Sequence, residues 1–273
     1  MKNRKILKKV LTPKYLETLS FLLSVFQKSR HPKICTGVLI GSQVHSPKRK
    51  SDLDLCFYTN QINNSKELIN SIKKIIDRPQ IKCIEAPRYI SDYHNRRIEL
   101  NLQISGILIE IAILDWDLNF ELTPHLIRKD EFERHIGNLF IYGICFYDLP
   151  RSNYHKIKEK FTPYYDESLR ILRIRVLKLA LTEKIKYLAN FSPDKLAQLN
   201  LLYVIERMML QYAFIYYKVY PYSYEKWIKK QFLELIKSKK LYFKFVDSFY
   251  GDYTIKQRVS KINSLLNYVE KGD

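Results

Sequence analysis

The chain has 273 residues, of which 46% are hydrophobic, so it can bury the core of one large domain or two small ones. This composition excludes a mainly disordered chain. The formal net charge of +19 favours a polyanionic partner such as nucleic acid and, equally, a lysine-rich solvated surface.

Cysteine usage and hydropathy indicate a cytoplasmic protein. The four cysteines lie far apart without a CxxC pair, which is typical of reduced thiols. The histidines lack HxxxH spacing, which argues against zinc, and no apolar run approaches membrane-spanning length. The basic N-terminus continues into "YLETLSFLLSVF", which contains Glu17 and lacks a small-residue cleavage site. It is therefore interpreted as an amphipathic helix rather than a signal peptide.

The first half of the chain predicts alternating helices and strands. Thr12 and Pro13 are typical of an N-cap and the first helical position, and apolar residues then recur at helical spacing up to Phe26. Two short apolar runs indicate buried strands, and a segment that starts with Ser65 has a helical pattern. The strands are predicted over 34–40 and 52–58, and the helix over 65–77.

The segment 98–114, "IELNLQISGILIEIAIL", predicts a β-hairpin. Apolar and polar residues alternate before Ser105 and Gly106, which form a plausible two-residue turn. With that turn the isoleucines share one face of the sheet, and Glu110 points to the other face. The expected cross-strand pairs are Ile104 with Ile107, Leu102 with Ile109, and Asn101 with Glu110.

The pattern becomes mostly helical after Pro124. One exception is 139–150, "LFIYGICFYDLP", which is expected to form a last strand and a linker near Pro150. The later helices are predicted over 168–190, 194–218, 223–238 and 255–270.

An α+β fold follows, in which a mixed sheet with helices on one face precedes an all-α domain. The predicted boundaries are 1–150 for the sheet domain and 151–273 for the helical domain. The first part carries 23 basic and 16 acidic residues and the second 24 and 12, so the positive excess is larger in the helical part.

The stretch "GVLIGSQVHSPKRKSDLDLCFY" combines features of a phosphate and metal site. Asp52 and Asp54 lie one residue apart on a predicted strand, so they project from the same face. Acids in a buried strand are costly unless they are neutralised. The break at Gly41 and Ser42 follows a strand, where backbone N–H groups and a hydroxyl can receive phosphate oxygens. Together with Glu110, the two aspartates would form an oxygen-ligand site for divalent cations.

These residues resemble the DNA polymerase β nucleotidyltransferase superfamily. "I-G-S", nine intervening residues and "D-L-D-L" are similar to its signature, and "LIEIAI" matches its later catalytic strand. The resemblance covers residues 34–114 and continues more loosely through "NLFIYGICFYD". It implies a nucleotidyltransferase-like sheet domain and metal-dependent transfer of a nucleoside monophosphate from an NTP, with release of pyrophosphate.

The resemblance also implies a role for each matched residue. Gly41 and Ser42 would hold the triphosphate, and Asp52 and Asp54 would bind two Mg²⁺ ions, with Mn²⁺ as an alternative. Glu110 would bind the ion that activates the acceptor hydroxyl and could take its proton. Glutamate replaces the commoner aspartate at this third position; Asp115 and Asp117 are alternatives to Glu110, which we favour.

A basic run borders this site. Lys48 and Arg49, followed by Lys50, would steer the triphosphate or an RNA backbone, although a solvated loop is an equally good interpretation. The run "QVHSPKRK" departs from the small residue, arginine and glycine that many small members of the superfamily have after Gly-Ser. The departure leaves the subfamily open.

The acceptor is the least determined part of the prediction. RNA is favoured by the charge, for example the 3′ end of tRNA as the target of a terminal nucleotidyltransferase or a toxin of a toxin–antitoxin pair. The alternatives are an aminoglycoside- or lincosamide-like small molecule, a protein side chain, and an inactive nucleotide- or RNA-binding module.

Two sets of side chains in the helical part have both a binding and a packing interpretation. Basic residues at helical spacing could contact phosphates or cover an ordinary helix surface, and clustered tyrosines are interpreted as packing residues more readily than as base-stacking ones. These are Arg170, Arg173, Arg175 and Lys178, and Tyr216, Tyr217, Tyr220, Tyr222 and Tyr224.

Overall fold

The computed structural model is α+β, as the sequence predicts. The described residues are 3–28, 33–47, 50–59, 65–92, 95–115, 131–149, 154–190 and 194–271. Contacts divide the chain into two compact units. A sheet unit contains Met1–Glu121 and Asn138–Glu159, and a helical unit contains Leu122–Gly137 and Lys160–Asp273.

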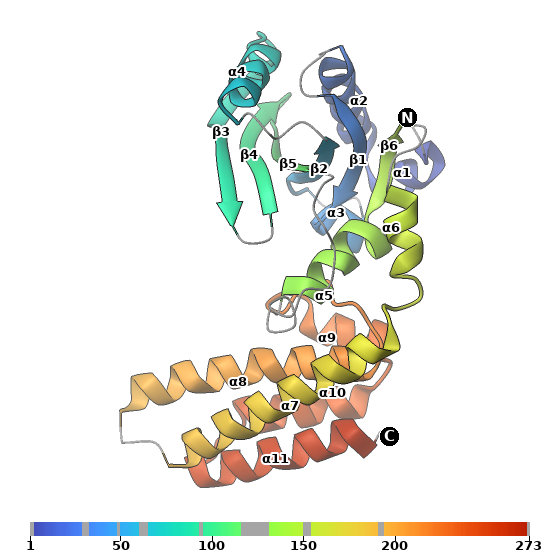
Figure 1. Cartoon of the computed structure of the whole chain (residues 1–273). Helices are drawn as coiled ribbons and strands as arrows, with labels where there is room; N and C mark the ends of the chain where they lie inside the picture. The colour runs from blue at the N-terminus through green and yellow to red at the C-terminus, as the bar shows by residue number, and fades with distance from the viewer. Residues whose placement is uncertain are drawn as a thin grey trace. The chain divides into compact units, whose positions relative to one another are not determined.

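The sheet unit is built on six strands in the order β3-β4-β5-β2-β1-β6 (Figure 1). β2 and β5 run parallel to each other, and every other neighbouring pair is antiparallel, so the sheet is mixed. The strands are β1 (Ile34–Ile40), β2 (Leu53–Thr59), β3 (Ile81–Asp92), β4 (Asn95–Ile104), β5 (Ile107–Asp115) and β6 (Ile144–Asp148).

The predicted hairpin is confirmed in its register. Ile104 pairs with Ile107, and Asn101 pairs with Glu110. Ser105 and Gly106 form the turn, and both have positive φ angles, which suits a two-residue hairpin loop. Strict alternation of apolar and polar residues fixed this register, since a slip of one residue would move every isoleucine to the opposite face.

One face of the sheet forms the core of this unit. Leu53, Leu55 and Phe57 of β2 are at most 1% exposed, and the alternate positions of β4 and β5 join the same buried cluster. The apolar stripes of helices α2 (Pro13–Gln27) and α4 (Ser65–Ile76) belong to that cluster. Residues that alternate with these on β2 and β5, among them Asp54 and Glu110, therefore lie on the opposite face.

The remaining helices of the sheet unit are short. They are α1 (Arg4–Val10), α3 (Ser42–His45) and α6 (Tyr154–Lys160). Thr12 precedes α2 with an extended backbone, and Pro13 occupies the first turn as predicted, but the Thr12 side chain makes no cap hydrogen bond.

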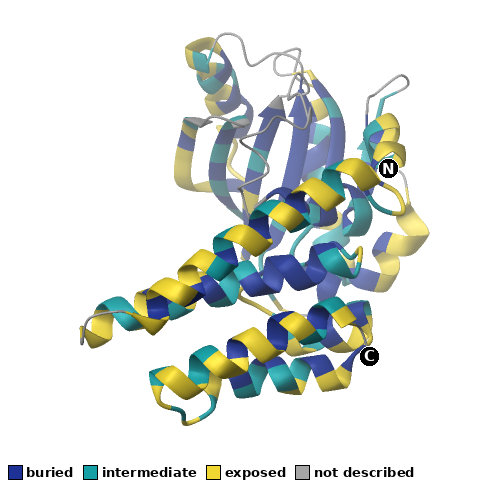
Figure 2. Ribbon diagram, turned by 60° about the horizontal axis from the view of Figure 1, so that its bottom comes forward, coloured by how far each residue is buried: buried dark blue, intermediate teal, exposed yellow. Residues whose placement is uncertain are grey.

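The helical unit contains four longer helices with a shared apolar core (Figure 2). They are α7 (Glu167–Ala189), α8 (Lys195–Tyr216), α10 (Lys239–Tyr250) and α11 (Ile255–Lys271). Its shorter elements are α5 (Glu131–Ile136), α9 (Ile228–Gln231) and the π-helical segment η3 (Phe232–Ile236). In the described part of the chain, no helix is long and apolar enough to cross a bilayer.

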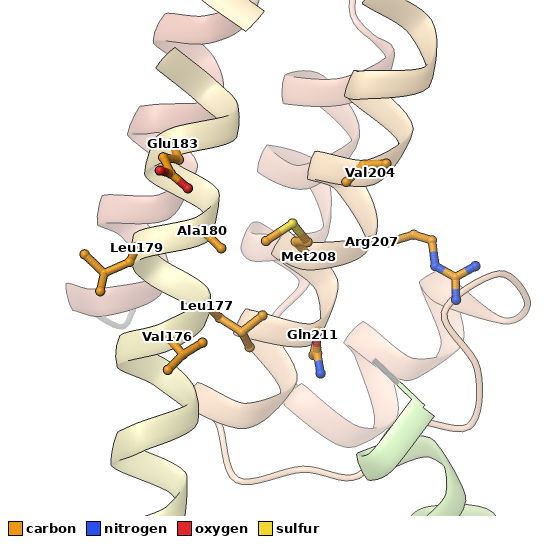
Figure 3. Close-up of a pocket in the computed structure, with 9 residues that line it drawn as sticks. All are labelled: Val176, Leu177, Leu179, Ala180, Glu183, Val204, Arg207, Met208 and Gln211. Atoms are coloured by element: carbon orange, nitrogen blue, oxygen red, sulfur yellow. The ribbon is translucent and has the colours of Figure 1, made fainter. Parts of the chain in front are cut away.

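A groove of about 610 Å³ lies along α7 and α8 (Figure 3). Leu177 and Ala180 of α7 and Val204 and Met208 of α8 line it, with Gln211 at one end. Several exposed large hydrophobic side chains lie on the same two helices: Ile171, Leu172, Leu179, Tyr187, Leu196, Leu199, Tyr203 and Val204.

A buried ion pair ties α5 to α7 within the helical unit. Arg173 is 1% exposed, and its Nη2 donates to Glu133 Oε2 at 2.7 Å. Tyr165 Oη donates to Glu133 Oε1 at 2.9 Å, and Gln211 Nε2 donates to Oε2 at 3.1 Å. Arg173 therefore has a structural role. Its burial favours the packing interpretation over a contact with phosphates.

The other basic residues and tyrosines named from the sequence are mainly in internal contacts. Arg170 pairs with Glu167, and Lys178 pairs with Glu270, while Arg175 is exposed. Tyr220 and Tyr224 are buried, which favours the packing interpretation for both.

The secondary structure differs from the prediction in several places. Leu139–Tyr142 lies in the π-helical segment η2 (Gly137–Tyr142), so only the second half of the predicted 139–150 strand forms β6. Residues 223–227 precede α9 instead of forming a helical turn, and the strand β3 and the helices α1 and α10 were not predicted. An apolar run without clear periodicity does not distinguish strand from helix, which explains the error at 139–142.

Candidate metal and nucleotide site

Three carboxylates converge on the face of the sheet opposite the helices α2 and α4. Asp54 and Glu110 are directly paired across the parallel strands β2 and β5, and Asp52 immediately precedes β2. One carboxylate oxygen from each residue lies within 4.8 Å of the other two. The structure thus brings together the three acids that the sequence predicted to converge, while their role as metal ligands stays a prediction.

The electrostatics of the cluster raise the proton affinity of Glu110. Its side chain is exposed, yet partial desolvation of the carboxylate raises its pKa, and the negative charge of Asp52 raises it further. A hydrogen bond with Asp54 acts in the opposite direction, and Glu85 adds a smaller upward shift. Crowded carboxylates of this kind favour binding of either a proton or a cation.

The negative charge of Asp54 also affects Cys56, the next residue on the same face of β2. Cys56 is fully buried, and its pKa is raised to about 12, first by burial and then by the negative charge of Asp54. The thiol therefore stays protonated at neutral pH, which makes it a packing residue rather than a metal ligand or a nucleophile.

Gly41 is needed because the backbone passes very close to Asp54. Its φ angle is +72°, and a Cβ atom added there would lie 1.8 Å from Asp54 Oδ2. The backbone N–H of Ser42 donates to that same oxygen at 3.3 Å. The glycine therefore has a structural reason to be present, in addition to the triphosphate contact that its motif implies.

The Ser42 side chain belongs to a small hydrogen-bonded group. Its Oγ lies 2.7 Å from Ser51 Oγ. Gln43, which is 1% exposed, donates from Nε2 to Ser51 Oγ at 2.9 Å. Tyr15 Oη donates to the carbonyl oxygen of Ser51 at 2.7 Å. These contacts hold Ser42 and the start of β2 together.

Several predicted site residues lie outside the described part of the chain or apart from the cluster. Lys48, Arg49 and Asp117 fall outside the described residues, as does the side chain of Asp115. Lys50 is described and exposed. The predicted roles of Lys48 and Arg49 in triphosphate binding thus stay predictions.

Sequence reasoning missed Ser51, Gln43 and Tyr15 as parts of the site. Ser51 stands directly before Asp52, so its position beside the metal-ligand motif was a usable signal. Gln43 directly follows Ser42 and had the same kind of signal. Tyr15 had none, because its contact with Ser51 depends on the packing of α2.

The donor set fits a hard divalent cation. Three carboxylate oxygens at this separation match the preference of Mg²⁺, Mn²⁺ and Ca²⁺ for oxygen ligands. The open face and the exposure of Glu110 leave room for water or a phosphate oxygen to complete the coordination, as Mg²⁺ requires.

Comparisons with solved structures return proteins that transfer nucleotides. The aminoglycoside 6-adenyltransferase from Bacillus subtilis matches 93% of this chain and 86% of its own, with 12% identity and a TM-score of 0.33. The Cid1 poly(U) polymerase matches 54% of this chain and 48% of its own, with 16% identity and a TM-score of 0.26. No protein-family model matches the chain, and no curated protein sequence does. At such TM-scores the activity must be argued from the site itself.

Proposed function

We propose that this protein is a metal-dependent nucleotidyltransferase that moves a nucleoside monophosphate from an NTP to an acceptor hydroxyl and releases pyrophosphate. The observation that carries the proposal is the convergence of Asp52, Asp54 and Glu110, beside the Gly41-Ser42 turn. Each feature alone is common in proteins; their combination provides a cation site and a phosphate-binding turn in direct contact.

The residues have distinct roles in this proposal. Asp52 and Asp54 hold the cations and, through them, the triphosphate, and Ser42 contacts a phosphate oxygen. Glu110 would bind the ion that activates the acceptor hydroxyl, and it accepts the proton of that hydroxyl, a role that its place beside Asp52 and Asp54 supports. Bound Mg²⁺ or Mn²⁺ would supply stabilisation of the negative charge on the entering and leaving oxygens.

RNA is the acceptor that the charge supports best. The formal net charge is +19, and the larger excess lies in residues 151–273. A cationic small molecule such as an aminoglycoside would be repelled by such a field, whereas RNA would be attracted. The helical unit would then provide the acceptor-binding surface.

The test uses the four NTPs, each labelled on the α-phosphate, with Mg²⁺ and total RNA. We expect label to enter RNA, pyrophosphate to be released, and both to fall by at least about 100-fold in Asp52→Ala and Asp54→Ala, since even outer-shell changes at metal sites cost 10–100-fold. Near-normal transfer by the double variant would contradict the metal mechanism. The exchange Glu17→Gln, at an exposed position of α2, is the folded control.

A binding experiment separates the acceptor classes. Affinity of the Asp52→Ala/Asp54→Ala protein for tRNA-sized RNA should fall steeply with salt, with a log–log slope of about −0.7 per neutralised phosphate for a single strand. Binding that is undetectable or insensitive to salt, together with transfer of label to a small hydroxylated compound, would exclude RNA as the acceptor.

A further inference from the structure

Three side chains beside the carboxylate cluster form a chain of hydrogen bonds: Gln43, Ser51 and Ser42. Gln43 Nε2 donates to Ser51 Oγ at 2.9 Å and lies 3.4 Å from the Ser51 carbonyl oxygen. Ser51 Oγ is 2.7 Å from Ser42 Oγ. Ser51 is half-buried and directly precedes Asp52, and Gln43 directly follows Ser42.

Donor and acceptor capacities allow this chain to end on a ligand. A serine hydroxyl has one proton to donate and two lone pairs that accept. The contact of 2.7 Å between Ser51 Oγ and Ser42 Oγ can run in either direction, and the Asp52 carbonyl oxygen at 3.4 Å is a second acceptor for the Ser51 proton. In the order Gln43 to Ser51 to Ser42, Ser42 accepts from Ser51 and keeps its own proton for a ligand.

This order of hydrogen bonds determines whether the Ser42 hydroxyl can donate to a ligand. When Ser42 accepts from Ser51, its own hydroxyl proton is available to a ligand. A phosphate oxygen can only accept hydrogen bonds, so it needs this orientation, and charge-assisted bonds of this kind are stronger than neutral ones. The Ser42 backbone N–H is already engaged by Asp54 Oδ2 at 3.3 Å, which leaves the hydroxyl as the outward donor.

We propose that Gln43 and Ser51 are positioning residues that hold the Ser42 hydroxyl as a donor to a triphosphate oxygen. This inference rests on the proposed function, because it assumes that an NTP binds at the turn. It assigns roles to two residues that the metal-ligand motif does not include. Tyr15 supports the arrangement by fixing the Ser51 carbonyl at 2.7 Å.

The test is a double-mutant cycle on NTP affinity. Dissociation constants are measured by calorimetry with Mg²⁺ for the NTP that binds the wild type most tightly, and for the matching NMP. We expect about tenfold weaker NTP binding in Ser42→Ala, the loss of one hydrogen bond to a charged group, and several-fold weaker binding in Ser51→Ala. In the double variant, Ser51→Ala should add nothing, because Ser51 acts through Ser42.

Further measurements distinguish positioning from a general structural role. NMP affinity should stay within about twofold of the wild type if the Ser42 hydroxyl contacts the β- or γ-phosphate. Ser51→Thr, which keeps the hydroxyl, should recover most of the NTP affinity. Gln43→Met, which removes the donor to Ser51, should weaken NTP binding even if Ser51→Ala does not fold. Ser24→Ala is the control, since this half-buried serine bonds only locally to Phe21 in α2.

The outcomes separate this inference from the proposed function. A wild type that binds none of the four Mg-NTPs would overturn both. NTP binding in which Ser51→Ala has no effect, or in which the two serine variants have additive effects, would overturn the positioning role alone.

Discussion

One carboxylate cluster in each unit of this protein illustrates two opposite arrangements. In the helical unit, Glu133 is fully buried, and its oxygens accept hydrogen bonds from Arg173, Tyr165 and Gln211. In the sheet unit, Glu110 lies beside Asp52 and Asp54, and its pKa is raised first by desolvation and then by the negative charge of Asp52.

Glu133 is neutralised by Arg173 within the protein, whereas Asp52, Asp54 and Glu110 are three acids that the fold brings together. A buried, hydrogen-bonded ion pair needs no ligand, because its two charges already compensate each other. A partly buried carboxylate beside other acids is in an unfavourable electrostatic environment, which a bound cation relieves. We therefore assign structure to the first cluster and chemistry to the second.

The largest expected effect comes from breaking the buried ion pair of Glu133 and Arg173. Arg173→Met leaves Glu133 buried without its cation, which should lower the free energy of unfolding by about 3–5 kcal/mol. Urea denaturation followed by circular dichroism measures it. The matched control is Arg175→Met, an exposed arginine on the same helix, which should change stability by less than about 0.5 kcal/mol.

A second exchange shows whether the lost stability in Arg173→Met comes from uncompensated charge. Glu133→Leu/Arg173→Met replaces the pair with apolar side chains and should be more stable than Arg173→Met alone, since buried pairs are often replaceable in this way. Equal loss in both variants would mean that packing, rather than charge, accounts for the effect.

The next largest effect concerns the close approach of the Gly41 backbone to Asp54, a member of the three-carboxylate cluster. Gly41→Ala adds a Cβ where Asp54 Oδ2 would be 1.8 Å away, at a φ angle of +72°. We expect a stability loss of about 1–3 kcal/mol and at least tenfold weaker Mn²⁺ binding, because Asp54 must move. Gly106→Ala is the control: its φ is +79°, but the nearest atom is Lys14 Nζ at 4.0 Å. That variant should lose stability and keep its Mn²⁺ affinity.

The smallest effect is a pH dependence in the metal-free protein. A carboxyl group whose pKa is raised on folding stabilises the folded state when protonated, and this contribution is lost as pH rises from the ordinary value of 4.5 through the raised one. The loss should stay below about 1 kcal/mol because Glu110 is exposed and solvent screens its charge.

Comparison of two glutamate variants isolates the contribution of Glu110 to the pH dependence of stability. Glu110→Gln should reduce the fall in stability above pH 4.5, and the remainder includes the share of Glu206, whose pKa is also raised by burial. Glu99→Gln should keep the full fall, because Glu99 on the neighbouring strand β4 is paired with Arg88 and Arg97. Thermal melting in EDTA over pH 4.5–7 measures both. An unchanged fall in Glu110→Gln would contradict the assignment of the raised pKa.

The sequence predicted the hairpin and the three acids well because the signals are local. Alternation on both sides of Ser105 and Gly106 fixed the register, and the register fixed the side of the sheet on which Glu110 lies. The resemblance assigned Glu110 to the later catalytic strand, but the convergence of Glu110 with Asp54 also needs the parallel pairing of β2 and β5, which no local pattern contains.

The remaining features could not be predicted because they depend on distant partners. Arg173 looked like a surface residue at helical spacing, and its partner Glu133 lies 40 residues earlier in the chain. Gln43 and Ser51 are eight residues apart and meet only because the chain turns back after β1. Leu139–Tyr142 has an apolar pattern that suits strand and helix alike, and packing selected the π-helix.

The central claim is that Asp52, Asp54 and Glu110 form a cation site, and direct measurement of Mn²⁺ binding tests it. Electron paramagnetic resonance counts free Mn²⁺ as protein is added at neutral pH. We predict binding by the wild type and at least tenfold weaker binding in each of Asp52→Asn, Asp54→Asn and Glu110→Gln, with Arg175→Met unchanged. A wild type that leaves Mn²⁺ free at millimolar concentration, or three carboxylate variants that bind it as the wild type does, would contradict the account.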